Sequence, residues 1–106
     1  MPQFTRTEAE ALLPRIRPLL EDLTRRKATY DVRPSPPVAH EIHALLREVA
    51  EFGIEVKDLD NGLIDFRAQR GGEEVYLCWR LGEGDRIDWW HPIEGGFAAR
   101  RPLREN

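Results

Sequence analysis

The fold is decided between Gly62 and Pro102, where the chain reads GLIDF (62–66), VYLCWRLGE (75–83), IDWWHP (87–92) and GGFAARRP (95–102). Apolar and polar residues alternate in these segments, and glycine-rich turns separate them, which is typical of antiparallel strands. All three tryptophans and the single cysteine of the chain lie in this stretch. We therefore expect both the sheet and the candidate functional residues here.

Working outward, the alternation begins directly after Gly53, at residues 54–57. The Asn61–Gly62 pair is a strong hairpin signal, and further turns are predicted at 71–72 and 82–85. These turns separate strands predicted at 54–57, 63–66, 75–81 and 87–91, with Pro92 at a strand end because proline cannot donate a ladder hydrogen bond. Residues 54–94 are thus predicted to form a four-stranded antiparallel β-meander.

The first half of the chain has helical periodicity. A helix is predicted from Thr5 to Lys27, because Thr5 and Glu8 form a capping-box pattern and leucines and isoleucines recur every three or four residues. Pro14 and Pro18 interrupt this pattern, so we expect a kink near Pro14 or a fresh helix start there. A proline-rich loop is predicted over residues 28–37.

A second helix is predicted over residues 36–52, with Ser35 as its N-cap and Gly53 as its stop signal. Two helices joined by a short loop favour an antiparallel hairpin over residues 1–53. The predicted fold class is α+β, a single domain of residues 1–106 in which this hairpin packs on the β-meander. Residues 95–106 form a basic C-terminal tail that contains Arg100, Arg101 and Arg104.

Composition limits the classes of function. A chain of 106 residues buries only a modest core, so a partner subunit is plausible and we expect a homodimer. The net charge of −3 disfavours nucleic acid as the main partner. A lone Cys78 excludes an internal disulfide, and the chain shows neither a signal peptide at its start nor an apolar run long enough to span a membrane. These features predict a soluble, cytoplasmic protein.

His91 is the most suggestive residue in the sheet region. With Asp65, Glu83 or Cys78 from neighbouring strands it is suited to ligate a metal or to act as a general base, although a histidine that packs at the sheet edge explains the same pattern. Because the histidine and cysteine spacing matches no known zinc signature, we assign no metal. Cys78 itself is predicted to be a small buried hydrophobic residue.

Charged and aromatic residues of the same region supply further candidates. Asp65 and Arg80 are predicted to pair across the sheet if their faces coincide, either as a structural pair or as an arginine fork for a carboxylate or phosphate. One of Trp89 and Trp90 is expected to point outward and to mark an interface. The histidines of the HEIH segment (40–43) are predicted to lie on a solvated helix face.

Several segments together resemble a family of small prokaryotic proteins, the domain of unknown function 2203 family. The resemblance is carried by Val56-Lys57-Asp58, by the strand 62–66, by Leu77-Cys78-Trp79, and by the pairs at 82–83 and 90–91. The segment Gly96-Phe97 with Arg100 and the opening FTRTEAEALLP (4–14) complete it. Many members of that family carry a longer helical hairpin than the loop between Lys27 and Val38 allows in this chain. The resemblance implies no activity.

Together these features favour a ligand- or protein-binding or assembly module rather than a nucleophile–base enzyme. Its expected partners are a second copy of the chain and a small anionic ligand or a protein, held by Asp65, Arg80, Glu83, Trp90, His91 and Arg100. The alternative is a small hydrolytic or metal-assisted enzyme that uses Asp65, Glu83 and His91 as acid, base or ligands. No catalytic residue or cofactor is assigned from the sequence alone.

Overall fold

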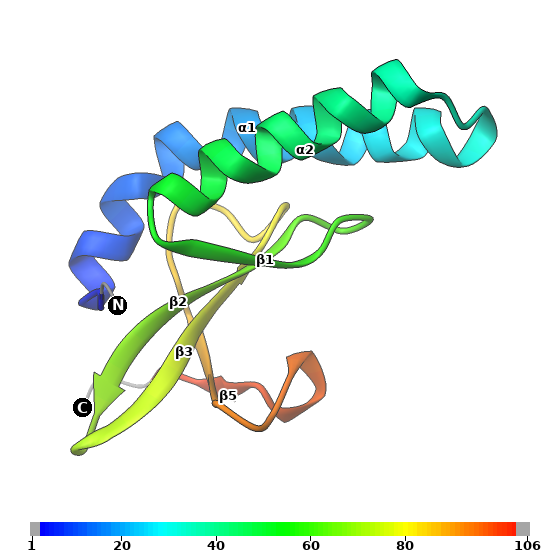
Figure 1. The fold of residues 1–106 in the computed structure, drawn as a ribbon. Coiled ribbons are helices and arrows are strands. Elements are labelled where there is room, and N and C mark those ends of the chain that lie inside the picture. The colour runs from blue at the N-terminus through cyan, green and yellow to red at the C-terminus, as the bar shows by residue number, and fades with distance from the viewer. Residues whose placement is uncertain (1–2, 104–106) are drawn as a thin grey trace.

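Two consecutive helices precede an antiparallel sheet in the computed structural model, which describes residues 3–103 (Figure 1). Arg104 and the rest of the predicted tail beyond residue 103 lie outside the described residues. The elements are α1 (Arg6–Val32), α2 (Pro36–Glu51), β1 (Ile54–Asp58), β2 (Leu63–Arg70), β3 (Glu73–Arg80), β4 (Trp89–Pro92), the 3₁₀ helix η1 (Phe97–Ala99) and β5 (Arg101–Pro102).

Helix α1 begins as predicted, with the complete capping box between Thr5 and Glu8. It continues unbroken past Pro14 and Pro18, and Figure 1 shows it bending between its first turns and its later ones. The buried stripe of Leu13, Ile16, Leu20 and Leu23 accounts for this continuity, because packing of an apolar face provides most of the stability of a helix.

The predicted loop from residue 28 is wrong, because α1 extends to Val32. Lys27 binds Asp31 one turn later at 2.8 Å and also Asp60 in the turn after β1 at 3.0 Å. Tyr30 packs against the core from the same added turn. These contacts stabilise the added turn, so the helix ends just before the proline cluster, where the chain reverses direction and α2 begins.

Helix α2 has the predicted caps. The Ser35 side chain accepts a hydrogen bond from the Val38 backbone, and the chain leaves the helix through Gly53 at a φ of +82°. Glu41 of α2 forms an ion pair of 2.8 Å with Arg26 of α1, which links the two helices of the hairpin. Within the described residues, no helix is long and apolar enough to cross a membrane.

The sheet is a meander in the order β1-β2-β3-β4-β5, so the predicted number of four strands is wrong. The added strand comes from the basic tail, where Arg101 pairs with Trp90 and Pro102 with Trp89. The Leu103 backbone then donates a hydrogen bond to the Asp88 carbonyl at 2.8 Å. A strand of two residues, one of them proline, is too short to produce the alternation that identifies a strand in a sequence.

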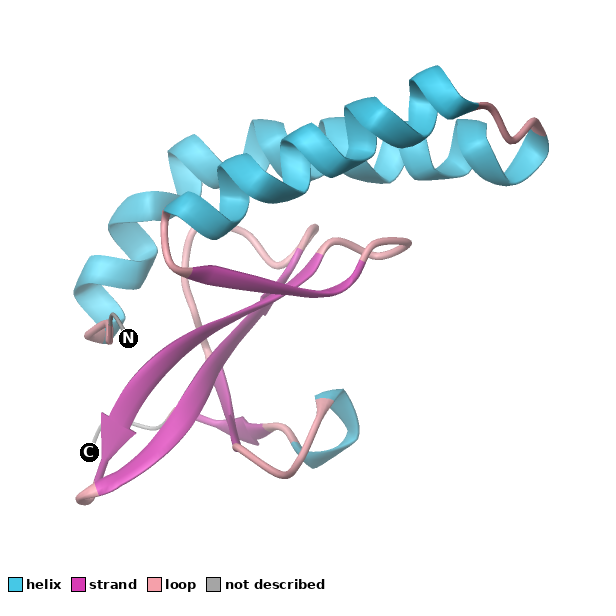
Figure 2. Cartoon of the chain, viewed as in Figure 1, coloured by secondary structure: helices cyan, strands magenta, loops and turns pink. Residues whose placement is uncertain are grey.

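The two faces of the sheet differ in what covers them. Ile64, Phe66, Leu77 and Trp79 belong to the buried core cluster that also contains the apolar stripe of the helices. We call the opposite side of the sheet the outer face. Figure 2 shows the helices on one side and the segment from β4 to β5 folded away from them, beyond the strands. Among the described residues, it is the C-terminal segment that lies over the outer face.

The turn at Gly62 provides a test of the fold. Gly62 has a φ of +64°, and a Cβ atom added to it would lie 2.5 Å from Leu81 Cδ1. Gly71 has a similar φ of +60° but nothing within 4 Å of an added Cβ. Both Gly→Ala changes carry a left-handed backbone strain of about 1 kcal/mol. At Gly62 the added Cβ also collides with Leu81, so we expect Gly62→Ala to lower the free energy of unfolding by about 1–2 kcal/mol more than Gly71→Ala. Urea denaturation of both variants measures this difference, and equal losses would contradict it.

Candidate functional site

The most unusual feature of the outer face is a buried pair of ionisable groups. Asp65 of β2 and His91 of β4 meet across β3, with Oδ2 and Nε2 2.9 Å apart. Their residues are only 1% and 3% exposed. The ring of Tyr76 lies beside that of His91, with centroids 5.3 Å apart. Two of the residues singled out from the sequence are thus brought into direct contact.

Both ring nitrogens of His91 are engaged. Nδ1 lies 2.7 Å from the carbonyl oxygen of Pro92, which can only accept, so Nδ1 carries a proton. The remaining contact between Nε2 and Asp65 Oδ2 is a hydrogen bond only if one further proton lies between them. Burial raises the pKa of Asp65, while the charge and hydrogen bond of His91 oppose that shift. The pair therefore holds one shared proton.

Cys78 completes a cluster on the same face. One ligand atom each from Asp65, Cys78 and His91 lies within 4.8 Å of the others, and all three residues are buried. Burial and the neighbouring Asp65 raise the pKa of the Cys78 thiol to about 12. The second oxygen of Asp65, Oδ1, is buried and makes no hydrogen bond of regular geometry, although the Cys78 thiol is close enough to the carboxylate to oppose the rise in the pKa of Asp65. Because the pKa of Cys78 is raised so far, this residue is a protonated thiol at neutral pH and not a nucleophile.

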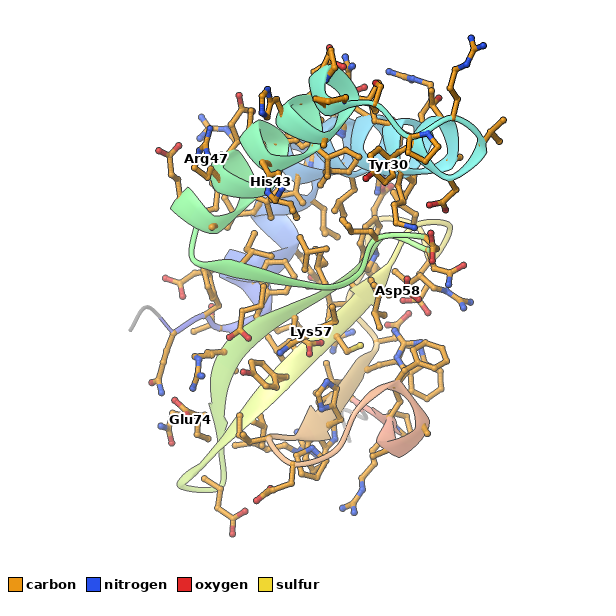
Figure 3. All side chains as sticks on the ribbon, turned by 45° about the vertical axis from the view of Figure 1, so that its right-hand side comes forward. Tyr30, His43, Arg47, Lys57, Asp58 and Glu74 are labelled. Carbon is orange, nitrogen blue, oxygen red and sulfur yellow. The ribbon has the colours of Figure 1, made fainter. Side chains whose placement is uncertain are left out.

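A cavity of about 390 Å³ opens beside this pair, and we call it the outer-face pocket. Its wall combines polar and apolar side chains, among them Lys57, Leu63, Asp65, Tyr76, His91 and Phe97. Lys57 Nζ binds Glu55 at 2.8 Å and lies 4.7 Å from the centre of the Tyr76 ring. Figure 3 shows Lys57 and Asp58, at the end of β1, on the same side of the helical hairpin.

Glu83 and Arg100 form a second polar cluster. The Arg100 guanidinium donates to both carboxylate oxygens of Glu83, at 2.6 and 2.7 Å, and to the Cys78 carbonyl at 3.3 Å. It also stacks on Phe97, with 4.6 Å between the guanidinium carbon and the ring centre. This contact fastens the C-terminal segment to the turn after β3, so the positive charge of Arg100 is balanced inside the fold.

The predicted pair between Asp65 and Arg80 does not form. The register of β2 and β3 places Asp65 opposite Cys78 and Arg80 opposite Leu63. Arg80 instead lies over the Phe97 ring, 5.1 Å from its centre. Asp65 therefore finds its polar partner one strand further away, in His91.

The tryptophans are covered by arginines of the same chain. Trp90 is half-buried, and the guanidinium groups of Arg70 and Arg101 lie 4.9 and 5.3 Å from its ring. Trp89, also half-buried, has Arg100 at 5.1 Å. Both rings thus have cationic partners within the chain, and the predicted interface at one of them stays a prediction. His40 and His43 are exposed on α2, as the helical spacing indicated, and Figure 3 shows His43 on the hairpin.

Sequence reasoning missed Lys57, Tyr76 and Phe97 as neighbours of the pair. The signal for the first two was present, because strand alternation puts both on the face that carries Asp65. No comparable signal existed for Phe97, which reaches the pocket from the 3₁₀ turn of the tail.

The Glu83–Arg100 contact predicts a pH-dependent stability. Partial burial raises the pKa of Glu83, but hydrogen bonds from Arg100 and from the Arg80 backbone lower it more, so the net shift is downward. A carboxyl group with a lowered folded-state pKa stabilises the fold above its unfolded pKa, and this contribution is lost as the pH falls through the folded value. We expect Glu83→Gln to cost about 2 kcal/mol at pH 7.

The stability deficit of Glu83→Gln should shrink as the pH is lowered through the acidic range. Urea denaturation from pH 7 to pH 3 measures it against the original chain. Glu94→Gln is the matched control, because Glu94 is exposed. A deficit that stays constant across this range would contradict the ion-pair explanation.

Comparison with known proteins gives one match. The model of the family described as "Uncharacterized conserved protein (DUF2203)" matches residues 36–103, which include α2, the whole sheet and every residue of the pair and pocket. No curated protein and no solved structure matches the chain. Since the match covers well over half of the sequence, the chain belongs to the DUF2203 family.

Proposed function

We propose that this domain is a binding module whose small-molecule ligand occupies the outer-face pocket, beside the Asp65–His91 pair. The observation that carries the proposal is the burial of that pair, with Asp65 Oδ1 left without a hydrogen bond. A buried ionic or polar pair is weak as a source of stability, because apolar residues of the same size fill such a position as well or better. A functional reason for the pair is therefore the better explanation.

The dimensions and lining of the pocket support a small ligand. Its volume of about 390 Å³ falls within the ~300–1,000 Å³ typical of small-molecule sites. Leu63, Ile93 and Phe97 offer apolar contact. Asp65 lines the pocket, and its buried Oδ1 is an acceptor that a donor could reach only after a small movement of the side chain. A ligand that matches this wall carries an amine, amide or hydroxyl donor on a small apolar body.

The small anionic ligand predicted from the sequence stays a prediction, and the local charges favour a donor instead. Of the two arginines in the predicted ligand set, Arg100 is neutralised by Glu83, and Arg80 lies over the Phe97 ring. In the pocket, Lys57 is bound to Glu55, while the carboxyl groups of Asp58 and Asp65 lie in the wall. The predicted homodimer and protein partner also stay predictions.

The form of the enzyme alternative that uses these residues as acid and base has less support from the geometry. Of its three proposed groups only Asp65 and His91 meet, since Glu83 is held by Arg100. His91 has no free ring nitrogen with which to take a proton from a substrate, because both are hydrogen-bonded within the chain. The Cys78 thiol, with its pKa raised to about 12, is a poor nucleophile.

The test is a screen of small amines, amides and alcohols by amide chemical-shift mapping on isotope-labelled, metal-free protein. We expect binders to shift the backbone amides of Gly95, Gly96 and His91, which belong to the pocket. Phe97→Ala removes a wall residue that is 43% exposed, so the fold should tolerate the change. It should weaken binding about fivefold to tenfold, because the ligand loses apolar contact worth about 1 kcal/mol.

Val32→Ala is the matched control for this screen. Val32 is 88% exposed at the end of α1. Its truncation should leave binding unchanged. Binders that map instead to the apolar hollow between the helices and Leu59, which is lined by Tyr30, Ile42 and Leu46, would contradict the proposal.

A further inference from the structure

We propose that Asp65, Cys78 and His91 form a site for a borderline transition-metal ion of the Zn²⁺ class. The three donors come from β2, β3 and β4, and their ligand atoms lie within 4.8 Å of one another. The inference concerns an ion and goes beyond the organic ligand proposed for the pocket, with which it shares Asp65 and His91.

The geometry is close to what an ion requires. Two donors at about 2.05 Å from Zn²⁺ in a tetrahedral arrangement lie about 3.3 Å apart, and a nitrogen and a thiolate sulfur about 3.6 Å apart. The His91 and Asp65 atoms, at 2.9 Å, would separate slightly. No two of the three donor atoms are more than 4.8 Å apart, so the most widely separated pair would have to move closer together by about 1 Å. Side-chain rotations on adjacent strands supply movements of this size.

The surroundings of His91 resemble those of a metal ligand. A ligating histidine usually donates its other ring N–H to a carbonyl or carboxylate, which fixes the tautomer. Here Nδ1 donates to the Pro92 carbonyl at 2.7 Å and leaves Nε2 directed at Asp65. The hydrogen bond that orients a metal-bound imidazole is therefore already made.

A separate observation at Asp65 points to the same conclusion. Its Oδ1 is buried without a hydrogen-bond partner, on a residue that is only 1% exposed. Buried polar atoms are almost always satisfied, so each exception needs an explanation. A cation bound between Asp65, Cys78 and His91 would place positive charge against this carboxylate and remove the deficit.

The local charges balance with a divalent ion in place. On binding, the ion would displace the thiol proton of Cys78 and the proton shared by Asp65 and His91, and both would pass to solvent. The thiolate and the carboxylate then carry two negative charges against the two positive charges of the ion. The charge of Arg100, which lies near Cys78, is compensated by Glu83 at 2.6 Å.

The donor set selects the kind of ion. Thiolate and imidazole ligands favour Zn²⁺, Co²⁺ and related ions, whereas Mg²⁺ and Ca²⁺ prefer oxygen ligands alone. Three protein ligands leave a fourth position, as in zinc sites that bind a water molecule or a substrate. Because Asp65 and His91 also line the outer-face pocket, we expect that position to face the pocket.

Cobalt titration provides the test. Protein freed of metal with a chelator is titrated with Co²⁺ and followed by absorbance. We expect the visible bands of four-coordinate cobalt and a thiolate-to-cobalt charge-transfer band, both saturating at one equivalent and both abolished by added Zn²⁺. Cys78→Ser should lose the charge-transfer band, and both it and His91→Gln should weaken Co²⁺ binding by at least about tenfold.

The matched control is the double variant His40→Ala/His43→Ala. These exposed histidines lie three positions apart on α2 and are the other place where the chain would hold Co²⁺ through imidazole. The double variant should bind as the original chain does. Circular dichroism checks that each variant is folded, and Cys78→Ala replaces Cys78→Ser if the hydroxyl group disturbs the strand.

Three outcomes would overturn the proposal. The original chain fails to give the bands at one equivalent; the bands disappear in the His40→Ala/His43→Ala variant; or the charge-transfer band persists without Cys78. Since the fragment screen uses metal-free protein, failure of the metal site and failure of the ligand pocket are observed separately.

Discussion

The eight-residue antiparallel pairing of β2 with β3 is the constraint on which the molecule depends. It aligns Ile64 with Trp79 and Phe66 with Leu77 on the helix side, and Asp65 with Cys78 on the outer face. Side chains alternate between faces, so a slip of one residue would expose the apolar set and bury the polar one against the helices. The core thus fixes the register, and the register brings the candidate site together. Asp65 lies beside Cys78 because Phe66 and Leu77 must be buried.

The sequence was informative where a local physical rule acts on a few neighbouring residues. The Thr5 capping box, the Ser35 cap, the Gly53 stop and the Asn61–Gly62 turn are such rules, and each holds in the structure. Periodicity likewise identified the helices and the strand faces. The predictions were wrong where contacts between residues far apart in the sequence determine the structure. The last turn of α1 is supported by the ion pair between Lys27 and Asp60. Strand β5 forms because the tail pairs with β4. Neither contact can be recognised from neighbouring residues in the sequence.

For the candidate site the same distinction holds. Alternation left open whether the faces of Asp65 and Arg80 coincide, and it cannot tell which residues touch; the register of β2 and β3 places Asp65 opposite Cys78. The contact between Asp65 and His91 spans β3, so it depends on the stagger of two hairpins at once. Strand alternation also cannot reveal how deeply a residue of the outer face is buried. Covering that face requires the tail to return, and the basic composition of the tail does not determine where it packs.

The return of the tail links the stability of the domain to its candidate site. Arg100 is held by Glu83 and stacks on Phe97, and Phe97 is part of the pocket wall. The same arginine donates to the carbonyl of Cys78, next to the proposed metal ligands. Besides the stability that is lost when this partly buried ion pair is broken, the pair fixes the position of the segment that closes the outer face. Its value to the protein is therefore also positional, because the segment that it holds supplies Phe97 to the wall of the pocket beside the Asp65–His91 pair.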